Sequence, residues 1–351
     1  MGEILGLGIT HHPGLAGPDR GFAYPLRAVL EDPGLSEELR RPEGWPEPMR
    51  QEWGLDDGLA AAGRHREAIV RRLRLARRAL DEFQPDFVLV WGDDQYENFR
   101  EDIIPPFCVL AYDSLEMQPW ASGRWGKNNI WGEPEDKRFQ IKGHPAAGKF
   151  LTARLLEDGF DVCYAYKPLH HDLGHAFSNA VLFLDYERRG WPYPLLPFQV
   201  NCYGRNVIAS KGFLRGLAEP EGEGELDPPS PAPWRCIDLG RAIARSLAES
   251  PWRVALVASS SWSHANLTRK NHYLHPDVEA DRELFAALRE GDYERWRERP
   301  LAALEESGQH EVLNWYCLLG AMAELGRKPD EAELVESWIF NSDKCFAIFR
   351  P

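Results

Sequence analysis

The chain has 351 residues, 43% of them hydrophobic and 27% charged, which is typical of a globular protein with one large or two ordinary domains. Its formal net charge of −14 argues against nucleic-acid binding, because such proteins need a basic surface to neutralise phosphates. No apolar run approaches the ~20 residues of a membrane span, and the N-terminal segment lacks the basic start of a signal peptide. The six cysteines form no CxxC pair, so we expect reduced thiols and a cytoplasmic protein that binds neither nucleic acid nor a membrane.

Apolar runs and helical patterns alternate along the chain. The run at 4–7 predicts a first strand, residues 58–82 have the spacing of an amphipathic helix, and 87–91 predicts a buried strand. The later predicted elements are a helix at 146–156, strands at 162–164 and 198–201, a helix at 236–248, a strand at 254–257, and helices at about 278–290 and 310–325. This alternation predicts a three-layer α/β/α single domain with a central mixed sheet and a helical C-terminal part.

Three segments depart from the alternation. Residues from about 112 to 143 include Trp120, Trp125 and Trp131, and they indicate either a lid or a surface loop held by aromatic packing. We expect the three tryptophans to pack within the protein rather than to stack on a substrate. Residues 218–234 are rich in Pro, Glu and Gly and predict a mobile surface loop. Residues after about 326 form a C-terminal extension that packs on a partner subunit or folds back over the pocket. We therefore predict a single domain over 1–351 with two insertions and this extension.

Polar residues follow several of the predicted strands. His11 and His12 come where the first strand ends, Asp94 follows the strand at 87–91, and His264 follows the strand at 254–257. Because binding groups collect at the carboxyl edge of an α/β sheet, we expect His11, Asp94 and His264 to share one edge. Imidazole nitrogen suits iron, zinc and manganese alike, so this edge is a candidate metal site.

The order of these motifs resembles the class III extradiol ring-cleaving dioxygenases, the family that includes the catalytic β subunit of protocatechuate 4,5-dioxygenase. The resemblance runs from the N-terminus to about residue 325. It is carried by His11-His12-Pro13, Ile103-Ile104-Pro105-Pro106-Phe107, Lys142-Gly143-His144-Pro145, Trp191-Pro192 through Pro197-Phe198 to Asn201, Arg235-Cys236-Ile237-Asp238-Leu239-Gly240, Ser263-His264, and Glu311 with Trp315. No single piece is decisive, but their shared order is specific.

The resemblance implies a mononuclear non-haem Fe(II) held by two histidines and a glutamate, with open positions for a catecholate and O2. Carried over by position, His11 is the first histidine ligand and Glu311 the carboxylate ligand. His175 matches a histidine that contacts the substrate. His264 matches the acid/base histidine that helps to deprotonate the catechol and later assists ring opening.

The chain departs from the family at the second histidine ligand. The family has an Asn-Asp-His turn, whereas the matching turn here is Gly92-Asp93-Asp94, so Asp94 stands in the ligand position. Either Asp94 ligates directly, or His12 swings in to restore a second nitrogen, or the metal is absent. We favour Asp94, because an aspartate remains a competent oxygen ligand. The additional carboxylate would favour Fe(II), with Mn(II) as the alternative.

The sequence therefore predicts an iron-dependent dioxygenase that opens the ring of a catechol-type or aminophenol-type substrate. The expected partners are a small aromatic substrate and O2, and relatives suggest a homo-oligomer such as a dimer, or a partner subunit. One alternative is a non-catalytic paralogous subunit of such a dioxygenase, since the turn with Asp94 lacks the family histidine. The other is a metal-dependent hydrolase or lyase on the same scaffold.

Overall fold

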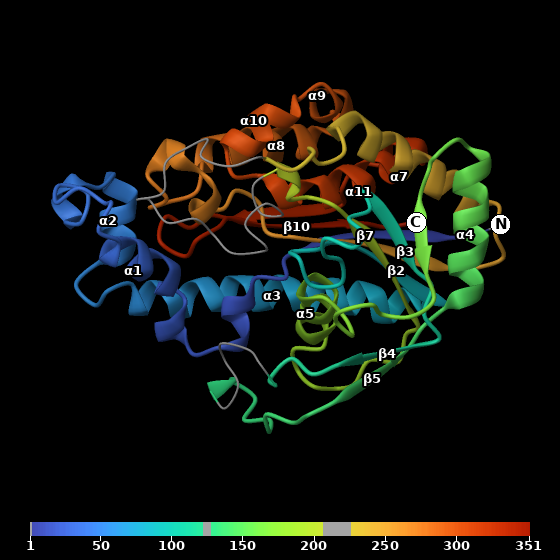
Figure 1. The fold of residues 1–351 in the computed structure, drawn as a ribbon. Helices are drawn as coiled ribbons and strands as arrows, with labels where there is room; N and C mark the ends of the chain where they lie inside the picture. Colours follow the sequence, from blue (N-terminus) through green and yellow to red (C-terminus); the bar gives the residue numbers. More distant parts are fainter. Residues whose placement is uncertain (1, 122–127, 206–225) are drawn as a thin grey trace.

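A computed structural model describes residues 2–121, 128–205 and 226–351, which form a layered α/β fold (Figure 1). The central sheet has eight strands in the order β6-β3-β7-β2-β8-β1-β10-β9. The strands are β1 (Ile4–Ile9), β2 (Phe87–Asp93), β3 (Phe107–Leu110), β6 (Cys163–Ala165), β7 (Leu195–Val200), β8 (Val254–Ser259), β9 (Glu331–Val335) and β10 (Lys344–Phe349). The four central strands, β7, β2, β8 and β1, are parallel, whereas β3 and β10 pair antiparallel with this group. The predicted α/β fold with a mixed central sheet is confirmed.

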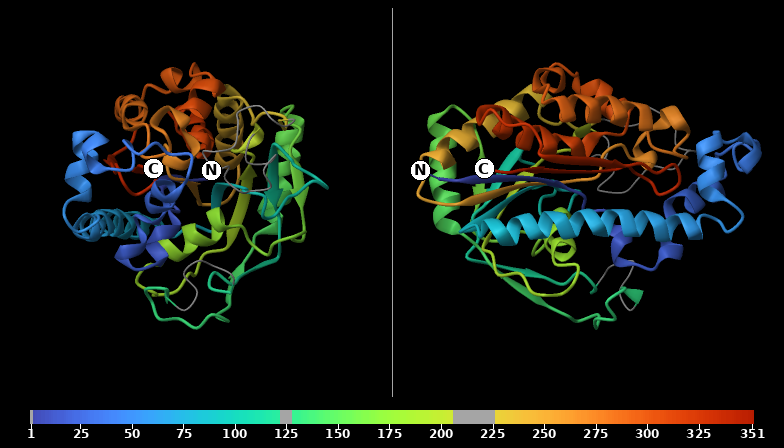
Figure 2. Two further views of the ribbon diagram at one scale, coloured as in Figure 1. Left: turned by 60° about the vertical axis from the view of Figure 1, so that its left-hand side comes forward. Right: turned by 180° about the vertical axis from the view of Figure 1, so that it is seen from behind.

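Helices cover both faces of the sheet (Figures 1 and 2). One face carries α1 (Tyr24–Glu31), α3 (Leu59–Phe83) and α5 (His175–Leu184), which share one apolar core with the sheet. The other face carries α4 (Pro145–Glu157), α7 (Pro233–Ala248) and α11 (Leu313–Glu324), with α8 (Val278–Glu290), α9 (Tyr293–Arg297) and α10 (Leu301–Glu306) nearby. The short α2 (Glu47–Trp53) precedes α3. Within the described ranges, no helix combines the length and the apolar character needed to cross a membrane.

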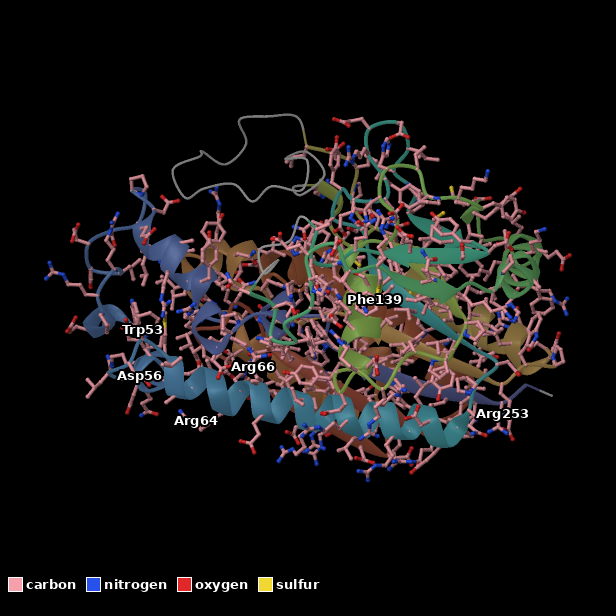
Figure 3. All side chains as sticks on the ribbon, turned by 90° about the horizontal axis from the view of Figure 1, so that it is seen from below. Trp53, Asp56, Arg64, Arg66, Phe139 and Arg253 are labelled. Carbon is pink, nitrogen blue, oxygen red and sulfur yellow. The ribbon has the colours of Figure 1, made fainter. Side chains whose placement is uncertain are left out.

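The long helix α3 positions the loop that follows β1. Figure 3 marks Arg64 and Arg66 on this helix; Arg64 is exposed, whereas Arg66 is half-buried. The Arg66 guanidinium donates to the carbonyl oxygen of Leu15 at 2.8 Å and also bonds the carbonyl of Gly17 and the carboxylate of Asp19. One side chain of α3 thus holds three points of the loop that begins at the end of β1.

Residues 112–121 and 128–143 are the part of the first insertion that the structure describes. This part contains β4 (Ser114–Met117) and β5 (Phe139–Lys142), which pair antiparallel. The rings of Trp120 and Trp131 lie 5.6 Å apart, and the Arg188 guanidinium lies 3.7 Å from the centre of the Trp131 ring. These two tryptophans pack within the protein, and Trp125 lies outside the described residues. Of the second insertion, residues 218–225 also lie outside the description, and α7 already begins within its last residues.

The segment after residue 326 enters the central sheet. It forms β9 and β10, and β10 pairs antiparallel with β1, Leu7 lying opposite Ile348. The predicted helical C-terminal part therefore ends with α11, and two strands follow it. These two strands read Glu-Ala-Glu-Leu-Val and Lys-Cys-Phe-Ala-Ile-Phe, and neither has, along its whole length, the strict alternation of apolar and polar residues that predicts a strand from sequence.

Two glycines allow α7 and α11 to touch along their backbones. A Cβ atom at Gly240 would lie 1.9 Å from the Cys317 carbonyl oxygen, and one at Gly320 would lie 2.0 Å from that of Ile237. Since real Cβ atoms do not approach this closely, neither position accepts a side chain without moving a helix. This contact fixes α11 and the residues immediately before it relative to the sheet.

Gly320→Ala is expected to destabilise the protein by about 1–3 kcal/mol, because the added methyl group forces α7 and α11 apart. Gly63→Ala is the matched control, since this glycine also lies inside a helix but its Cβ would meet no atom closer than 3.6 Å. There alanine should stabilise by about 0.5–1 kcal/mol through its higher helix propensity. Urea unfolding followed by circular dichroism measures both changes, and a neutral Gly320→Ala would show that the helices do not pack this closely.

Candidate metal centre and active site

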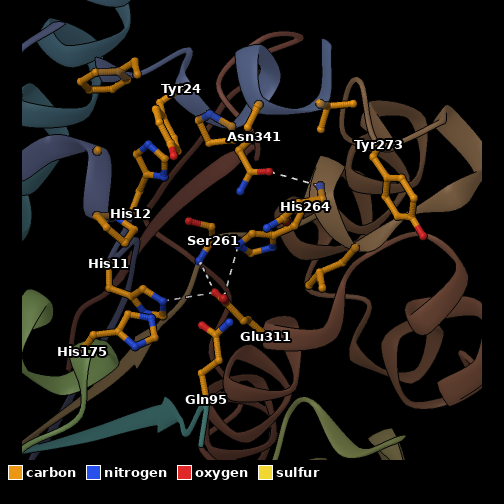
Figure 4. Close-up of a pocket in the computed structure, with 18 of the residues that line it drawn as sticks. His11, His12, Tyr24, Gln95, His175, Ser261, His264, Tyr273, Glu311 and Asn341 are labelled. Carbon is orange, nitrogen blue, oxygen red and sulfur yellow. Dashed lines mark hydrogen bonds and ion pairs between the residues drawn. The ribbon is translucent and has the colours of Figure 1, made fainter. Parts of the chain in front are cut away.

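The candidate site lies at the carboxyl edge of the four parallel strands, where the sheet brings distant segments together (Figure 4). His11 follows β1, Asp93 is the last residue of β2, and His264 follows β8. Tyr203 follows β7, and Glu311 lies in the single turn of 3-10 helix His310–Val312 that precedes α11. His11 and His264 lie at the same edge of the sheet, as the sequence predicted.

Close packing around two glycines sets the positions of the elements at this edge. A Cβ at Gly8 of β1 would lie 2.1 Å from the Trp315 ring, so the first turn of α11 sits directly against β1. A Cβ at Gly92 of β2 would lie 2.7 Å from the Phe177 ring, so α5 begins equally close to β2. Because these two strand positions have no side chain, the elements that carry Glu311 and His175 can approach the edge closely, each from a different face of the sheet.

His11 is held with its outer ring nitrogen facing two carboxylates. Its Nδ1 lies 3.0 Å from the carbonyl oxygen of Ser259, to which it donates. Its Nε2 lies 3.3 Å from Oε2 of Glu311 and 3.8 Å from Oδ1 of Asp93. A histidine that ligates a metal usually donates its second N–H to a carbonyl or carboxylate in this way, which fixes the tautomer and the ring orientation.

Glu311 is the centre of the polar network. Its Oε2 accepts a hydrogen bond from the backbone N–H of Ser261 at 3.2 Å, and its Oε1 accepts one from the Tyr203 hydroxyl. The Nε2 of His264 lies 3.3 Å from Oε1, while Nδ1 of that ring lies 2.7 Å from the carbonyl oxygen of Trp262. Burial opposes ionisation of Glu311, but the neighbouring His264 and His11 hold the pKa of its carboxyl group well below the usual value.

His175, the first residue of α5, stands against His11. The two ring centres lie 5.0 Å apart, and Nδ1 of His175 lies 2.7 Å from Oε2 of Glu97. Burial alone would lower the pKa of His175, but the Glu97 carboxylate raises it to about 10. Ligand atoms of His11, Asp93 and His175 all lie within 4.8 Å of one another, a spacing that one metal ion can bridge.

Asp93, rather than Asp94, faces the site. Successive side chains of a strand point to opposite faces of the sheet, so Asp93 turns toward α11 and Asp94 toward the other side. The Asp94 carboxylate accepts the backbone N–H groups of Glu97, Asn98 and Phe99 at 3.2, 2.7 and 3.3 Å, and the Asn98 side-chain amide at 2.8 Å. Asp94 thus closes its own turn, and Asp93 is the carboxylate that faces His11, where the sequence predicted Asp94.

His12 also points away from the metal-ligand cluster. Its ring lies 5.6 Å from that of Phe22, and burial holds its pKa well below the usual value. Figure 4 shows Gln95 directed toward Glu311, so Gln95 is a second residue of the β2 turn that faces the site and that the sequence reasoning missed. Tyr203 was missed as well. Strand alternation at 93 and 95 is the signal that could have found the two residues of the β2 turn.

The donor set fits a divalent cation. Asp93 and Glu311 are buried carboxylates that compete for the same imidazole, and burial together with Glu311 raises the pKa of Asp93 to about 7. Among the described residues, Oδ2 of Asp93 is buried without a hydrogen-bond partner. Atoms bound to one metal at about 2.1 Å lie about 3 Å apart, close to the spacing around His11 Nε2. One imidazole with two carboxylates is a combination that Fe(II) and Mn(II) accept.

A pocket of about 690 Å³ opens onto this cluster. Its inner end contains the side chains of His11, Gln95, His175, His264 and Glu311. The pocket then continues past Asn341 to α1 and to the turns after β8 (Figure 4). A substrate can therefore reach the candidate metal ligands from solvent.

Comparison with known proteins finds similarity to ring-opening dioxygenases. Residues 226–347 match the family described as the catalytic LigB subunit of aromatic ring-opening dioxygenase. The chain is 26% identical over 201 residues to a 2,3-dihydroxyphenylpropionate/2,3-dihydroxicinnamic acid 1,2-dioxygenase of Comamonas testosteroni, covering 56% of this chain and 49% of that protein. It is 27% identical over 198 residues to a gallate dioxygenase of Pseudomonas putida, covering 55% and 49%. These matches confirm the predicted relationship to the class III extradiol dioxygenases.

The chain spans about half the length of the curated relatives it matches. A third relative, a 2,3-dihydroxyphenylpropionate/2,3-dihydroxicinnamic acid 1,2-dioxygenase of a Rhodococcus species, is 29% identical over 189 residues, covering 54% of this chain and 46% of that protein. The family match extends past residue 326 and so includes most of the strands β9 and β10. The resemblance therefore reaches further along the chain than the sequence motifs indicated.

Asp93→Asn is expected to lower the metal affinity, because a buried anionic ligand becomes neutral. The loss should exceed about 10- to 100-fold, which is the cost of losing a residue that only contacts a metal ligand. Asp94→Asn should keep its metal, since the amide oxygen still accepts N–H groups of the turn. Titration of the purified variants with Fe(II) and Mn(II), without oxygen, measures both affinities. Equal losses in the two variants, or a loss in Asp94→Asn alone, would return the ligand role to Asp94.

Proposed function

We propose that this chain is a non-haem Fe(II) enzyme that cleaves the ring of a catechol-type or aminophenol-type substrate with O2. The observation that carries the proposal is the approach of His11 Nε2 to Glu311 Oε2 at 3.3 Å, at the inner end of an open pocket. Relatives named as ring-cleaving dioxygenases support the reaction class. A bound Fe(II) would supply adjacent open positions for the two substrate oxygens and for O2.

The side chains around the candidate metal position have separable roles. His11, Asp93 and Glu311 would hold the metal, and Tyr203 orients Glu311 through its hydroxyl group. His264 donates from Nδ1 to the Trp262 carbonyl, so Nε2, which lies 3.3 Å from Oε1 of Glu311, is the nitrogen that can gain or lose a proton. Burial lowers the pKa of His264, which favours the neutral ring that can take a hydroxyl proton from the substrate and return it later.

His175 would contact the substrate rather than take the proton. Its Nδ1 is committed to Glu97, which fixes the ring so that its other edge faces the space beside His11. A ring held in this way can donate to a substrate oxygen at a defined position. Glu97 also accepts the backbone N–H of His175, so the same carboxylate fixes both the ring and the start of α5.

The donor set keeps one alternative reaction class open. One histidine and two carboxylates make a more oxygen-rich site than the family's two histidines and one carboxylate, and oxygen-rich sites also serve Mn(II) and metal-dependent hydrolases or lyases. A non-catalytic paralogous subunit is disfavoured by the convergence of His11, His264 and Glu311 on one pocket. The cytoplasmic location and the dimeric or two-subunit assembly remain predictions.

Oxygen uptake decides between these possibilities. Fe(II)-reconstituted protein mixed with a panel of catechols and aminophenols should consume O2 and form a yellow ring-opened product. Turnover that continues under nitrogen would instead identify a hydrolase or lyase. Metal binding without turnover in either atmosphere, for every member of the panel, would favour the non-catalytic subunit.

His264→Ala is expected to lower kcat by about 10²–10⁴-fold, the usual contribution of a general acid or base. The metal content should stay near that of the wild type, because His264 is not among the three proposed ligands. His170→Ala is the control, since this histidine is exposed and pairs with Asp102 outside the pocket. An unchanged kcat in His264→Ala on a true substrate would remove the residue from proton transfer.

A further inference from the structure

We propose that the substrate carries, beyond its reacting ring, an apolar group of at least ring size that has no negative charge and has an oxygen acceptor at its base. This inference rests on the proposed function and adds the substrate class to it. It concerns the outer half of the pocket, here called the outer chamber, which is lined by Phe22, Pro25, Ala28, Val29, Leu267 and Tyr273. None of these residues belongs to the proposed metal-binding or proton-transfer groups.

One wall of the outer chamber is a face of α1. The pocket is lined by two adjacent pairs of this helix, Tyr24 with Pro25 and Ala28 with Val29. The two pairs are about one helical turn apart, which places them on one side of the helix. Leu26 points the other way and is buried in the core. A short surface helix normally buries its apolar face against protein, whereas α1 presents part of this face to a cavity. Such a face is matched by an apolar ligand.

The floor of the outer chamber is rigid. Phe22 is buried, and its ring lies 5.6 Å from that of His12 and 5.5 Å from that of Phe340. The Arg66 guanidinium lies 4.8 Å from the centre of the same ring. Leu267 and Tyr273 form the opposite wall from the turns after β8. Because its walls are already ordered, the chamber loses little conformational entropy when a ring enters it.

The size of the pocket exceeds what a single catechol ring needs. At about 690 Å³ it falls in the range that encloses drug-sized ligands, typically about 300–1,000 Å³. A diol chelated at the inner end leaves the outer chamber to whatever is attached to the ring. Asp32, at the end of α1, also lines the pocket, so a negatively charged attachment is disfavoured there by repulsion between like charges.

Asn341 marks the boundary between the inner end and the outer chamber. Its backbone adopts a left-handed conformation with φ of 67°, and its Oδ1 accepts the backbone N–H of Asn266 at 3.2 Å. This bond orients the amide so that the nitrogen points into the pocket, between Tyr24 and His264 (Figure 4). The amide N–H is placed to donate to an oxygen on the group that links the reacting ring to its apolar substituent.

Anaerobic binding to the Fe(II)-reconstituted protein tests the apolar chamber. We expect 3-phenylcatechol or 4-phenylcatechol to bind about 10- to 100-fold more tightly than catechol, the gain expected from burying one phenyl ring. In Ala28→Trp, which fills the chamber, the ratio of the two dissociation constants should fall toward one. Glu31→Trp is the matched control, because it adds the same bulk on α1 outside the pocket lining and should keep the wild-type ratio.

The outcomes separate this inference from the proposed function. If catechol and the phenylcatechols bind equally, or if Ala28→Trp keeps the wild-type ratio, the outer chamber does not recognise the substrate and this inference fails alone. If none of these compounds binds, the proposed function fails together with it. Thermal unfolding of both tryptophan variants verifies that they are folded.

The role of Asn341 is tested with a second ligand pair. The atom that links the two rings is a carbonyl carbon in 4-benzoylcatechol and a methylene carbon in 4-benzylcatechol. The wild type should prefer the carbonyl compound by about 2- to 12-fold, the value of one neutral hydrogen bond. Asn341→Asp keeps the acceptor for Asn266 and tolerates the left-handed backbone, but it replaces the donor, so the preference should disappear or reverse. A preference that persists in Asn341→Asp would exclude the amide as its source.

Discussion

The approach of His11 to Glu311 is the contact on which the rest of the site depends. The two residues are separated by almost the whole chain, and their side-chain atoms meet at 3.3 Å because β1 lies beside β8 and because α11 rests on bare backbone at Gly8. Trp315, one turn after Glu311, fills the space that this glycine leaves. A side chain at position 8 would displace α11 and with it the carboxylate, so the geometry of the site is a consequence of packing on the sheet.

A second layer of buried polar groups holds the turn that carries His264. The Asp281 carboxylate accepts the backbone N–H of Ser263 at 2.9 Å and the Gln309 side-chain amide at 2.6 Å. The backbone N–H of Trp262 donates to the carbonyl oxygen of Asp343. Burial raises the pKa of Asp281 to about 7 and also raises that of Asp343. The turn is therefore tied to α8, to the turn before Glu311 and to the start of β10. Hydrogen bonds to three separate elements restrict the movement of this turn, which suits a residue proposed to transfer protons at a fixed position.

Sequence periodicity predicted most of the central sheet and the helices on it, because buried strands and amphipathic helices have distinct patterns. It also predicted that His11 and His264 share an edge, since both follow strands. The sequence placed Asp94 at this edge, whereas Asp93 is the residue that faces His11, because a shift of one residue in a strand reverses the side on which a carboxylate lies. Tyr203 and Asn341 could not be found in this way, because their positions follow from tertiary contacts of irregular segments rather than from a local pattern.

Because two buried carboxylates compete for one imidazole, a metal bound between them would add to the stability of the fold. Asp93 and Glu311 are both fully buried. A protonated His11 would supply only one positive charge for the two carboxylates, and that charge would itself be buried. A divalent cation between them would relieve the repulsion and supply the partner that Oδ2 of Asp93 lacks among the described residues. Because the unfolded chain has no such arrangement, the free energy of metal binding adds to the free energy of unfolding. A second carboxylate in place of a neutral ligand would thus bind the cation through charge while making the metal-free protein less stable.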